Sequence, residues 1–176
     1  PRFSELRPKA IEKRKVYIGI NRIMVSMGGM DPENVTATVL EGLSGVDWTH
    51  MPAVDVVLRG KAPCLQRVVT MARKSRLKIL VSTDVPDMAE RMLTADLAIG
   101  AGGTTSWERC CLGLPALTII TADNQKMVGN VLDKVGAVRI LGISQKISVE
   151  NIKKNLERLL KNSIYLHNMS QVGFGV

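Results

Sequence analysis

The sequence has few aromatic residues, few cysteines and few histidines. Phe, Trp and Tyr make up 3% of the 176 residues, too few for the base-stacking surface of a single-strand nucleic-acid-binding protein. Cys64, Cys110 and Cys111 form an odd set without metal-ligand spacing, so we expect reduced thiols and a cytoplasmic protein. The two histidines, His50 and His167, have no nucleophile beside them in a known catalytic arrangement.

Long apolar runs are also missing. None approaches the ~20 residues that a membrane-spanning helix needs, so no membrane span is predicted. The chain has no signal-peptide pattern and opens with Pro1 rather than Met, and we therefore expect it to be part of a longer protein. Hydrophobic residues make up 45% of the sequence, enough for the core of one α/β domain.

The net charge of +8 and the pI near 9.7 raise the question of nucleic-acid binding. The basic residues are spread along the chain rather than gathered in one segment, which favours a solvated surface or attraction of an anionic small ligand or an acidic partner domain. With so few aromatic residues, we expect no nucleic-acid partner. A basic scaffold or nucleic-acid-binding module stays as the non-enzymatic alternative.

Short apolar runs alternate with helical patterns along the chain. This alternation predicts an α/β fold: a Rossmann-like, doubly wound parallel sheet of about six strands with right-handed crossovers. Residues 1–15 are expected to form an interdomain linker and a short helix, 16–165 a ligand-binding domain, and 166–176 a C-terminal tail. The expected strands are 22–27, 54–58, 78–81, 97–99, 116–120 and 137–141, and the main helices are 33–43, 64–75, 86–94, 107–112, 124–134 and 149–161.

The stretch from Asp96 to Gln125 carries the clearest site pattern. A strand runs into four small residues at 100–103, Gly-Ala-Gly-Gly, where the backbone can approach a ligand closely. Thr104 to Ser106 are helix N-cap types, and a helix start preceded by glycines suits a phosphate. A turn whose glycines serve only packing is the alternative. The spacing matches neither the Walker loop nor the dinucleotide fingerprint.

Other polar and glycine-containing loops follow strands at the same expected edge of the sheet. Ligands of such sheets bind there, near the point where strand order reverses. Glu108, one turn into its helix, can accept two hydrogen bonds from a ribose diol or can be a solvated carboxylate favoured by the helix dipole. Asn124 is expected as a helix cap or a ligand contact, and Trp107 as a core residue. Asp31, followed by Pro32, is expected to cap the helix at 33–43.

Taken together, three segments resemble the carboxyl-terminal half of the UDP-2,4-diacetamido-2,4,6-trideoxy-β-L-altropyranose hydrolases of pseudaminic acid biosynthesis. The segments are MVSMGGMDPENVT, STDVPDMAERMLTADLAIGAGGTTSWERCCLGLPALTI and TADNQ. The chain also resembles spore coat polysaccharide proteins and, more distantly, the N-acetylglucosaminyltransferase that makes lipid II. The resemblance covers about residues 3–141 and implies the C-terminal domain of a two-Rossmann (GT-B) fold.

The resemblance implies a role for each residue that matches the family's motifs. Glu108 would hold the ribose hydroxyls, and Val85 would contact uracil. The diphosphate would lie against the helix start, and its contacts would be Gly29, Met30, Gly102, Gly103, Thr104 and Thr105. Asn124 and Gln125 would face the sugar or the β-phosphate. The ligand would be UDP or a UDP-sugar, with no further cofactor and no metal.

The reaction that the resemblance implies is attack of water on the anomeric carbon, with inversion and release of UDP. The family's proposed catalytic histidine lies in an amino-terminal domain, and neither His50 nor His167 matches it. We therefore expect the catalytic residue in a missing amino-terminal domain and no turnover by this chain alone. A UDP-sugar glycosyltransferase of the same fold, with an acceptor in place of water, is the enzymatic alternative.

Overall fold

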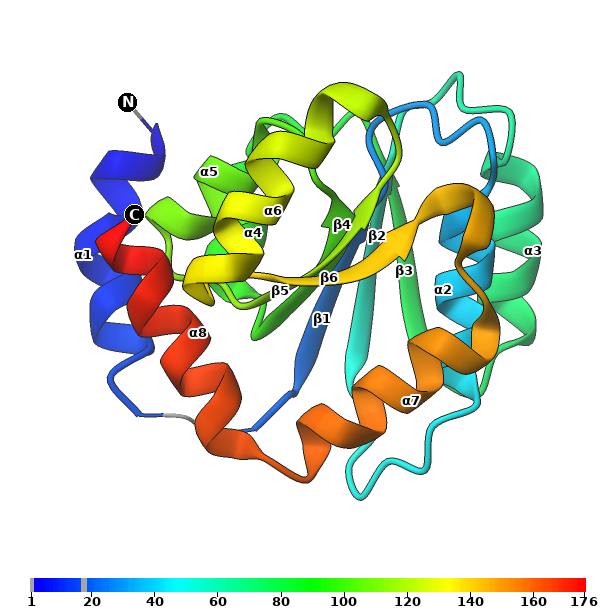
Figure 1. The fold of residues 1–176 in the computed structure, drawn as a ribbon. Helices are drawn as coiled ribbons and strands as arrows, with labels where there is room; N and C mark the ends of the chain where they lie inside the picture. The colour runs from blue at the N-terminus through cyan, green and yellow to red at the C-terminus, as the bar shows by residue number, and fades with distance from the viewer. Residues whose placement is uncertain (1, 17–18) are drawn as a thin grey trace.

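The computed structural model describes residues 2–16 and 19–176, so Pro1 lies outside the described residues. One six-stranded parallel sheet with the order β3-β2-β1-β4-β5-β6 forms its centre (Figure 1). This order, with its reversal between β1 and β4, is that of the doubly wound Rossmann fold, and the predicted fold class is confirmed. The strands are β1 (Arg22–Ser26), β2 (Ala53–Leu58), β3 (Lys78–Thr83), β4 (Leu97–Ala101), β5 (Ala116–Ile120) and β6 (Arg139–Ile143).

Helices cover both faces of the sheet (Figure 1). One face carries α2, α3 and α7, and the other carries α1, α4, α5 and α6, with α8 running from the end of α7 toward α5. Because both faces are covered, β4 and β5 are buried along their whole length, which explains their continuous apolar sequences. The helices are α1 (Arg2–Lys13), α2 (Val35–Ser44), α3 (Leu65–Lys74), α4 (Met88–Thr94), α5 (Thr105–Cys111), α6 (Lys126–Val135), α7 (Val149–Leu160) and α8 (Ser163–Gly175).

Two apolar clusters form the core, one on each face. On β1 the side chains alternate between them: Ile23 and Val25 lie in the cluster under α2 and α7, and Met24 lies in the cluster under α1 and α4. This alternation follows from the two-residue period of a strand. Because side chains of each central strand are buried on both faces of the sheet, the strand ends, and with them the loops that follow, are held in fixed positions.

The ends of several elements differ from the prediction. The last strand begins at Arg139 and not at residue 137, because the N–H groups of Ala137 and Val138 bond back to Leu132 O, at 2.9 and 3.4 Å, and complete the end of α6. Asp31 does cap α2, but it accepts from the N–H groups of Val35 and Thr36, at 2.9 and 2.8 Å. The helix accordingly starts two residues later than expected.

The first and the last helix of the described chain, α1 and α8, both pack against the domain. Residues 166–175 of the expected tail belong to α8, where Phe174 stacks under the Arg7 guanidinium at 5.3 Å from the ring centroid. The amino-terminal helix α1 packs against α4 and α5. No helix in the described part of the chain has both the length and the apolar character to cross a membrane.

Arg14 anchors the end of α1. Its buried guanidinium donates to the carbonyl oxygens of Leu112, Met92 and Ala95 at 2.8, 3.1 and 3.2 Å. These carbonyls end α4 and α5, where helix groups lack partners of their own and where a positive charge is favourable. One side chain thus joins three helices.

We predict that Arg14→Met lowers the free energy of unfolding by about 2–4 kcal/mol, because three carbonyls lose their charged donor. Urea unfolding followed by circular dichroism measures this. Lys9→Met, on the exposed side of the same helix, is the matched control and is expected to change the value by less than about 0.5 kcal/mol. Equal stability of the two variants would contradict the anchoring role.

Candidate functional site

The loops after β1 and β4 lie side by side at the carboxyl edge of the sheet. The two strands pair in parallel with Ser26 opposite Gly100, so the loops that follow them leave the sheet at the same level. The chain then turns to α2 on one face after β1 and to α5 on the other face after β4 (Figure 1). The diverging connections create the crevice in which doubly wound sheets bind ligands.

The glycines of the loop after β4 serve different purposes. A Cβ on Gly100 would lie 2.5 Å from Arg109 Nη1 and 2.6 Å from Ser26 O, and one on Gly102 would lie 2.9 Å from Ile120 Cδ1. Packing alone therefore requires the glycine at 100, where a backbone oxygen is in the way, and it also favours the glycine at 102, which fits closely against side chains of β5. A Cβ on Gly103 would meet only Gln125 Nε2 at 3.7 Å, an ordinary contact. Internal packing does not explain the glycine at 103.

Gln125 joins the loop after β5 to the loop after β4. Its Oε1 accepts from the N–H groups of Gly102 and Thr121 at 3.2 and 3.1 Å. The Gly102 N–H also donates to Ile119 O, so it is occupied within the protein. In the described part of the chain, the N–H groups of Gly103 and Thr104 donate to no protein oxygen, which leaves them for an external acceptor.

Glu108 lies half-buried in the first turn of α5, one helical turn beyond Thr104. Burial raises the pKa of its carboxyl group, and the charge of the neighbouring Arg109 partly opposes that rise. The adjacent Trp107 is 47% exposed, so the expectation of a core residue is wrong. The reason is the helix phase: Ser106, Arg109 and Cys110 occupy the inner face of α5 and leave Trp107 outside.

Arg109 is a residue that the sequence analysis missed. It is 4% exposed, and its Nη2 donates to Ala101 O at 2.6 Å and to Ser106 Oγ at 3.0 Å. Burial lowers the pKa of Arg109 to about 10, so the group stays charged at neutral pH. An arginine within a helix of mixed composition gives no sequence signal of burial; only the topology places it beneath the glycine loop.

The remaining predicted residues lie around the same edge. Gly29 O accepts from the N–H of Arg59 at 2.9 Å, and Met30 is 43% exposed. Asn124 is exposed in the 3₁₀ turn η1 (Asp123–Gln125) and makes no capping bond, so the helix-cap alternative is wrong. Val85 follows β3, the outer strand of the sheet, and so is separated by β2 from the loop after β1. Its side chain is partly buried and packs against the core under α4.

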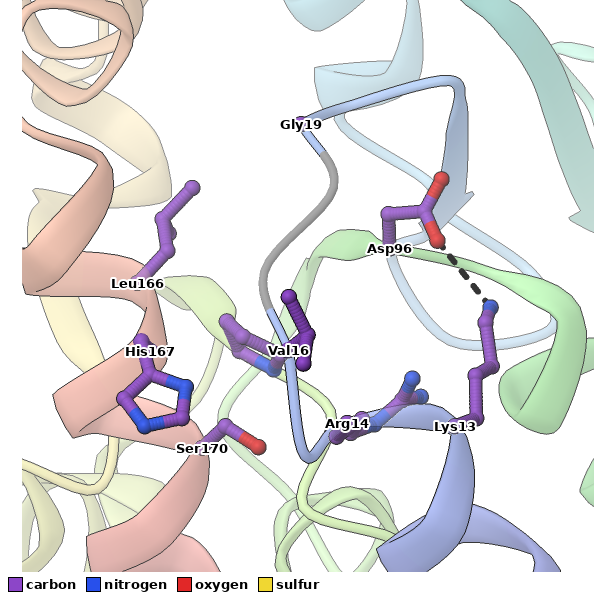
Figure 2. Close-up of a pocket in the computed structure, with 9 residues that line it drawn as sticks. Lys13, Arg14, Val16, Gly19, Asp96, Leu166, His167 and Ser170 are labelled. Carbon is purple, nitrogen blue, oxygen red and sulfur yellow. Dashed lines mark ion pairs between the residues drawn. The ribbon is translucent and has the colours of Figure 1, made fainter.

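The structure does not gather the histidines at this edge. His50 is exposed in the loop before β2, and His167 lies on α8. His167 instead lines a cavity of about 30 Å³, together with Lys13 and Asp96. The Nζ of Lys13 lies 3.0 Å from Oδ1 of Asp96. Figure 2 shows the residues that line this cavity. Asp96 directly precedes β4, so this pocket lies at the opposite, amino-terminal edge. Residues 2–16 and 19–176 contain no group of three or more His, Cys, Asp or Glu side chains suited to a metal ion.

Comparison with known proteins identifies a family. Residues 55–173 match the glycosyltransferase family 28 C-terminal domain. The spore coat polysaccharide biosynthesis protein SpsG of Bacillus subtilis is 27% identical over 141 residues, which are 80% of this chain and 41% of that protein. The chain thus spans less than half of this curated relative.

Solved structures share the fold. MurG of Acinetobacter baumannii superposes with a TM-score of 0.75 at 18% identity, over 93% of this chain and 48% of MurG. The UDP-GlcNAc 2-epimerase of Neisseria meningitidis, solved with UDP-GlcNAc bound, gives a TM-score of 0.67 at 13% identity, over 97% of this chain and 46% of the epimerase. In each case the chain corresponds to about half of the neighbour.

We predict effects of different size on the free energy of unfolding for two glycines of the same loop. Gly100→Ala lowers the free energy of unfolding by about 1–3 kcal/mol, because the new methyl group meets a backbone oxygen and a buried guanidinium. Gly103→Ala changes it by less than about 0.5 kcal/mol. Chemical unfolding of both variants measures the difference. A large loss of stability in Gly103→Ala would show that this glycine, too, serves packing.

Proposed function

The chain belongs to the family of glycosyltransferase family 28 C-terminal domains, and from this membership we propose that it is the UDP-binding half of an enzyme that acts on a UDP-activated amino-deoxy sugar. One observation supports the proposal most directly. Gly103, Thr104, Glu108 and Gln125 lie near one another, beside the point between β1 and β4 where the strand order reverses. The epimerase of the same fold, solved with UDP-GlcNAc bound, supports a nucleotide-sugar as the ligand class.

In this proposal the diphosphate lies against the loop after β4. The N–H groups of Gly103 and Thr104, together with the hydroxyl groups of Thr104 and Thr105, donate to its oxygens. Gly29 and Met30 approach it from the loop after β1. Gly102 lets the loop pack closely on Ile120, and its own N–H stays with Gln125.

The ribose and the uracil of the nucleoside contact residues outside that loop. The carboxylate of Glu108 accepts hydrogen bonds from the two ribose hydroxyls, and Val85 contacts uracil, partly through its backbone. Asn124 and Gln125 face the sugar or the β-phosphate. The same donors that bind the diphosphate stabilise the negative charge that grows on UDP as the bond to the anomeric carbon breaks.

We assign hydrolysis as the reaction: water attacks the anomeric carbon and UDP leaves. The similarity to the spore coat protein SpsG supports a place in surface polysaccharide biosynthesis. We extend the proposal to nonulosonic acid biosynthesis and to the cytoplasm as the location. The base that activates water belongs to an amino-terminal domain of the parent protein. A glycosyltransferase is the second candidate, favoured by the family match and by the likeness to MurG. Assaying UDP release by the parent protein with and without a sugar acceptor separates the two.

The proposed site predicts selective binding of UDP that depends on Glu108. Calorimetric titration of the chain with UDP, CMP and ATP should detect preference for UDP. Glu108→Ala should weaken UDP binding by about 10- to 100-fold, since a charged acceptor for two hydroxyls is lost. Glu150→Ala, the same change in the first turn of α7, is the control and should leave the affinity unchanged.

Failure of UDP to bind even the parent protein would refute the proposed function. Salt-sensitive binding of RNA or DNA without preference for UDP would instead favour the basic scaffold.

The proposal also predicts the pH dependence of nucleoside binding. The carboxyl group of Glu108 has a raised pKa, and only its ionised form offers two charged oxygen acceptors to the two ribose hydroxyls. Affinity should therefore be constant well above that pKa and fall as the pH is lowered through it. Uridine is the ligand of choice because it has no phosphate to titrate, and chemical shift changes report its binding. Glu108→Gln should remove this pH dependence; an unchanged profile in that variant would assign the titration to another group.

A further inference from the structure

Arg109 brings a charge into the interior directly behind the glycine loop. Its side chain points from α5 toward the ends of β1 and β4. All its hydrogen bonds go to the segment that it underlies: Ala101 O at 2.6 Å and Ser106 Oγ at 3.0 Å. Its Nη1 lies against Gly100, where a Cβ would be only 2.5 Å away. The guanidinium is therefore in direct contact with the loop backbone.

No carboxylate pairs with this charge. In the described part of the chain no Asp or Glu oxygen lies within ion-pair distance of Arg109, and its buried Nε has no hydrogen-bond partner. Glu108 attracts it only through space. By contrast, Arg91, in the neighbouring helix, contacts the buried Asp55 at 2.7 Å. A buried cation without a counter-ion is costly, and such groups are usually paired or neutralised.

The structure offers one place where an anion could compensate this charge. The guanidinium bonds Ala101 O just before the loop and Ser106 Oγ just after it. Between these two contacts, the N–H groups of Gly103 and Thr104 have no acceptor in the described part of the chain. An anion at those groups would be attracted by Arg109 through the low-dielectric loop rather than through water. The neutral part of a ligand would gain nothing from the same charge.

We propose that Arg109 is a positioning residue that holds the glycine loop in its binding shape and, from behind that loop, selects phosphate-bearing ligands over neutral ones. This rests on the proposed function, because it concerns how that site recognises the diphosphate of its ligand. Arg109 does not touch the ligand. Its charge acts across the loop on the phosphates, whereas Glu108 and Val85 recognise the nucleoside.

The test compares the affinities of UDP and uridine by titration of the 176-residue chain. Arg109→Gln keeps a polar side chain, shorter than that of arginine, but removes the charge. We expect it to reduce the ratio of UDP to uridine affinity by about tenfold, the order of one partly screened charge, with uridine affinity within about threefold of the wild-type value. Arg139→Gln removes a charge at the amino-terminal end of β6, on the other edge of the sheet from the loop. It should leave the ratio of UDP to uridine affinity unchanged.

The outcomes separate the inference from the function on which it rests. If the wild-type chain and its parent bind no UDP, both are wrong. If UDP binds but Arg109→Gln weakens UDP and uridine equally, Arg109 is only structural and the inference is overturned. Arg109→Lys, which keeps a cation, covers the case in which the glutamine variant does not fold. It should retain most of the wild-type ratio, and loss of the ratio in a folded lysine variant would contradict selection by charge.

Discussion

The parallel pairing of β1 with β4 is the constraint on which the site depends. It sets Ser26 opposite Gly100, so two loops that are more than 70 residues apart in sequence leave the sheet at one level. Because α2 and α5 then cover opposite faces, the two loops diverge and leave a crevice. Every polar group that we propose for the diphosphate lies on these two loops, at the start of α5 or on the neighbouring loop after β5.

The contact between Gly100 and Arg109 converts this topology into a defined loop shape. The strand can continue through Gly100 only because no side chain stands between the backbone and the guanidinium. In turn, the guanidinium bonds the next carbonyl, Ala101 O, and the hydroxyl of Ser106 in the following helix. The loop between them carries Gly103 and Thr104. It is thus fixed on its buried side by Arg109, while Thr104 is exposed to solvent.

Much of the fold could be predicted because burial on both faces makes a strand a short continuous apolar run. All six strands and the helices between them were expected within a few residues. The errors have local causes that depend on tertiary contacts. Ala137 and Val138 have strand-like composition but finish a helix, and Trp107 is exposed because the inner face of α5 is already filled.

Less of the site could be predicted, because the sequence shows which residues are glycines but not what surrounds them. Gly100, Gly102 and Gly103 form one motif in the sequence, yet only Gly103 has no packing reason to lack a side chain. Likewise Asn124 and Gln125 are adjacent amide residues, and the sequence gives no reason to prefer one of them as a site residue. In the structure only Gln125 reaches the loop, while Asn124 is exposed.

The assignment of chemistry to the two halves follows from where charge changes during the reaction. In the proposed reaction, breaking the bond between UDP and the sugar places negative charge on the diphosphate, and this chain carries donors and a buried cation suited to that charge. Water and a sugar acceptor differ only on the opposite side of the anomeric carbon. Under this proposal a hydrolase and a transferase can share this domain unchanged, and the choice between them would belong to the groups that the proposed amino-terminal domain presents to the attacking oxygen.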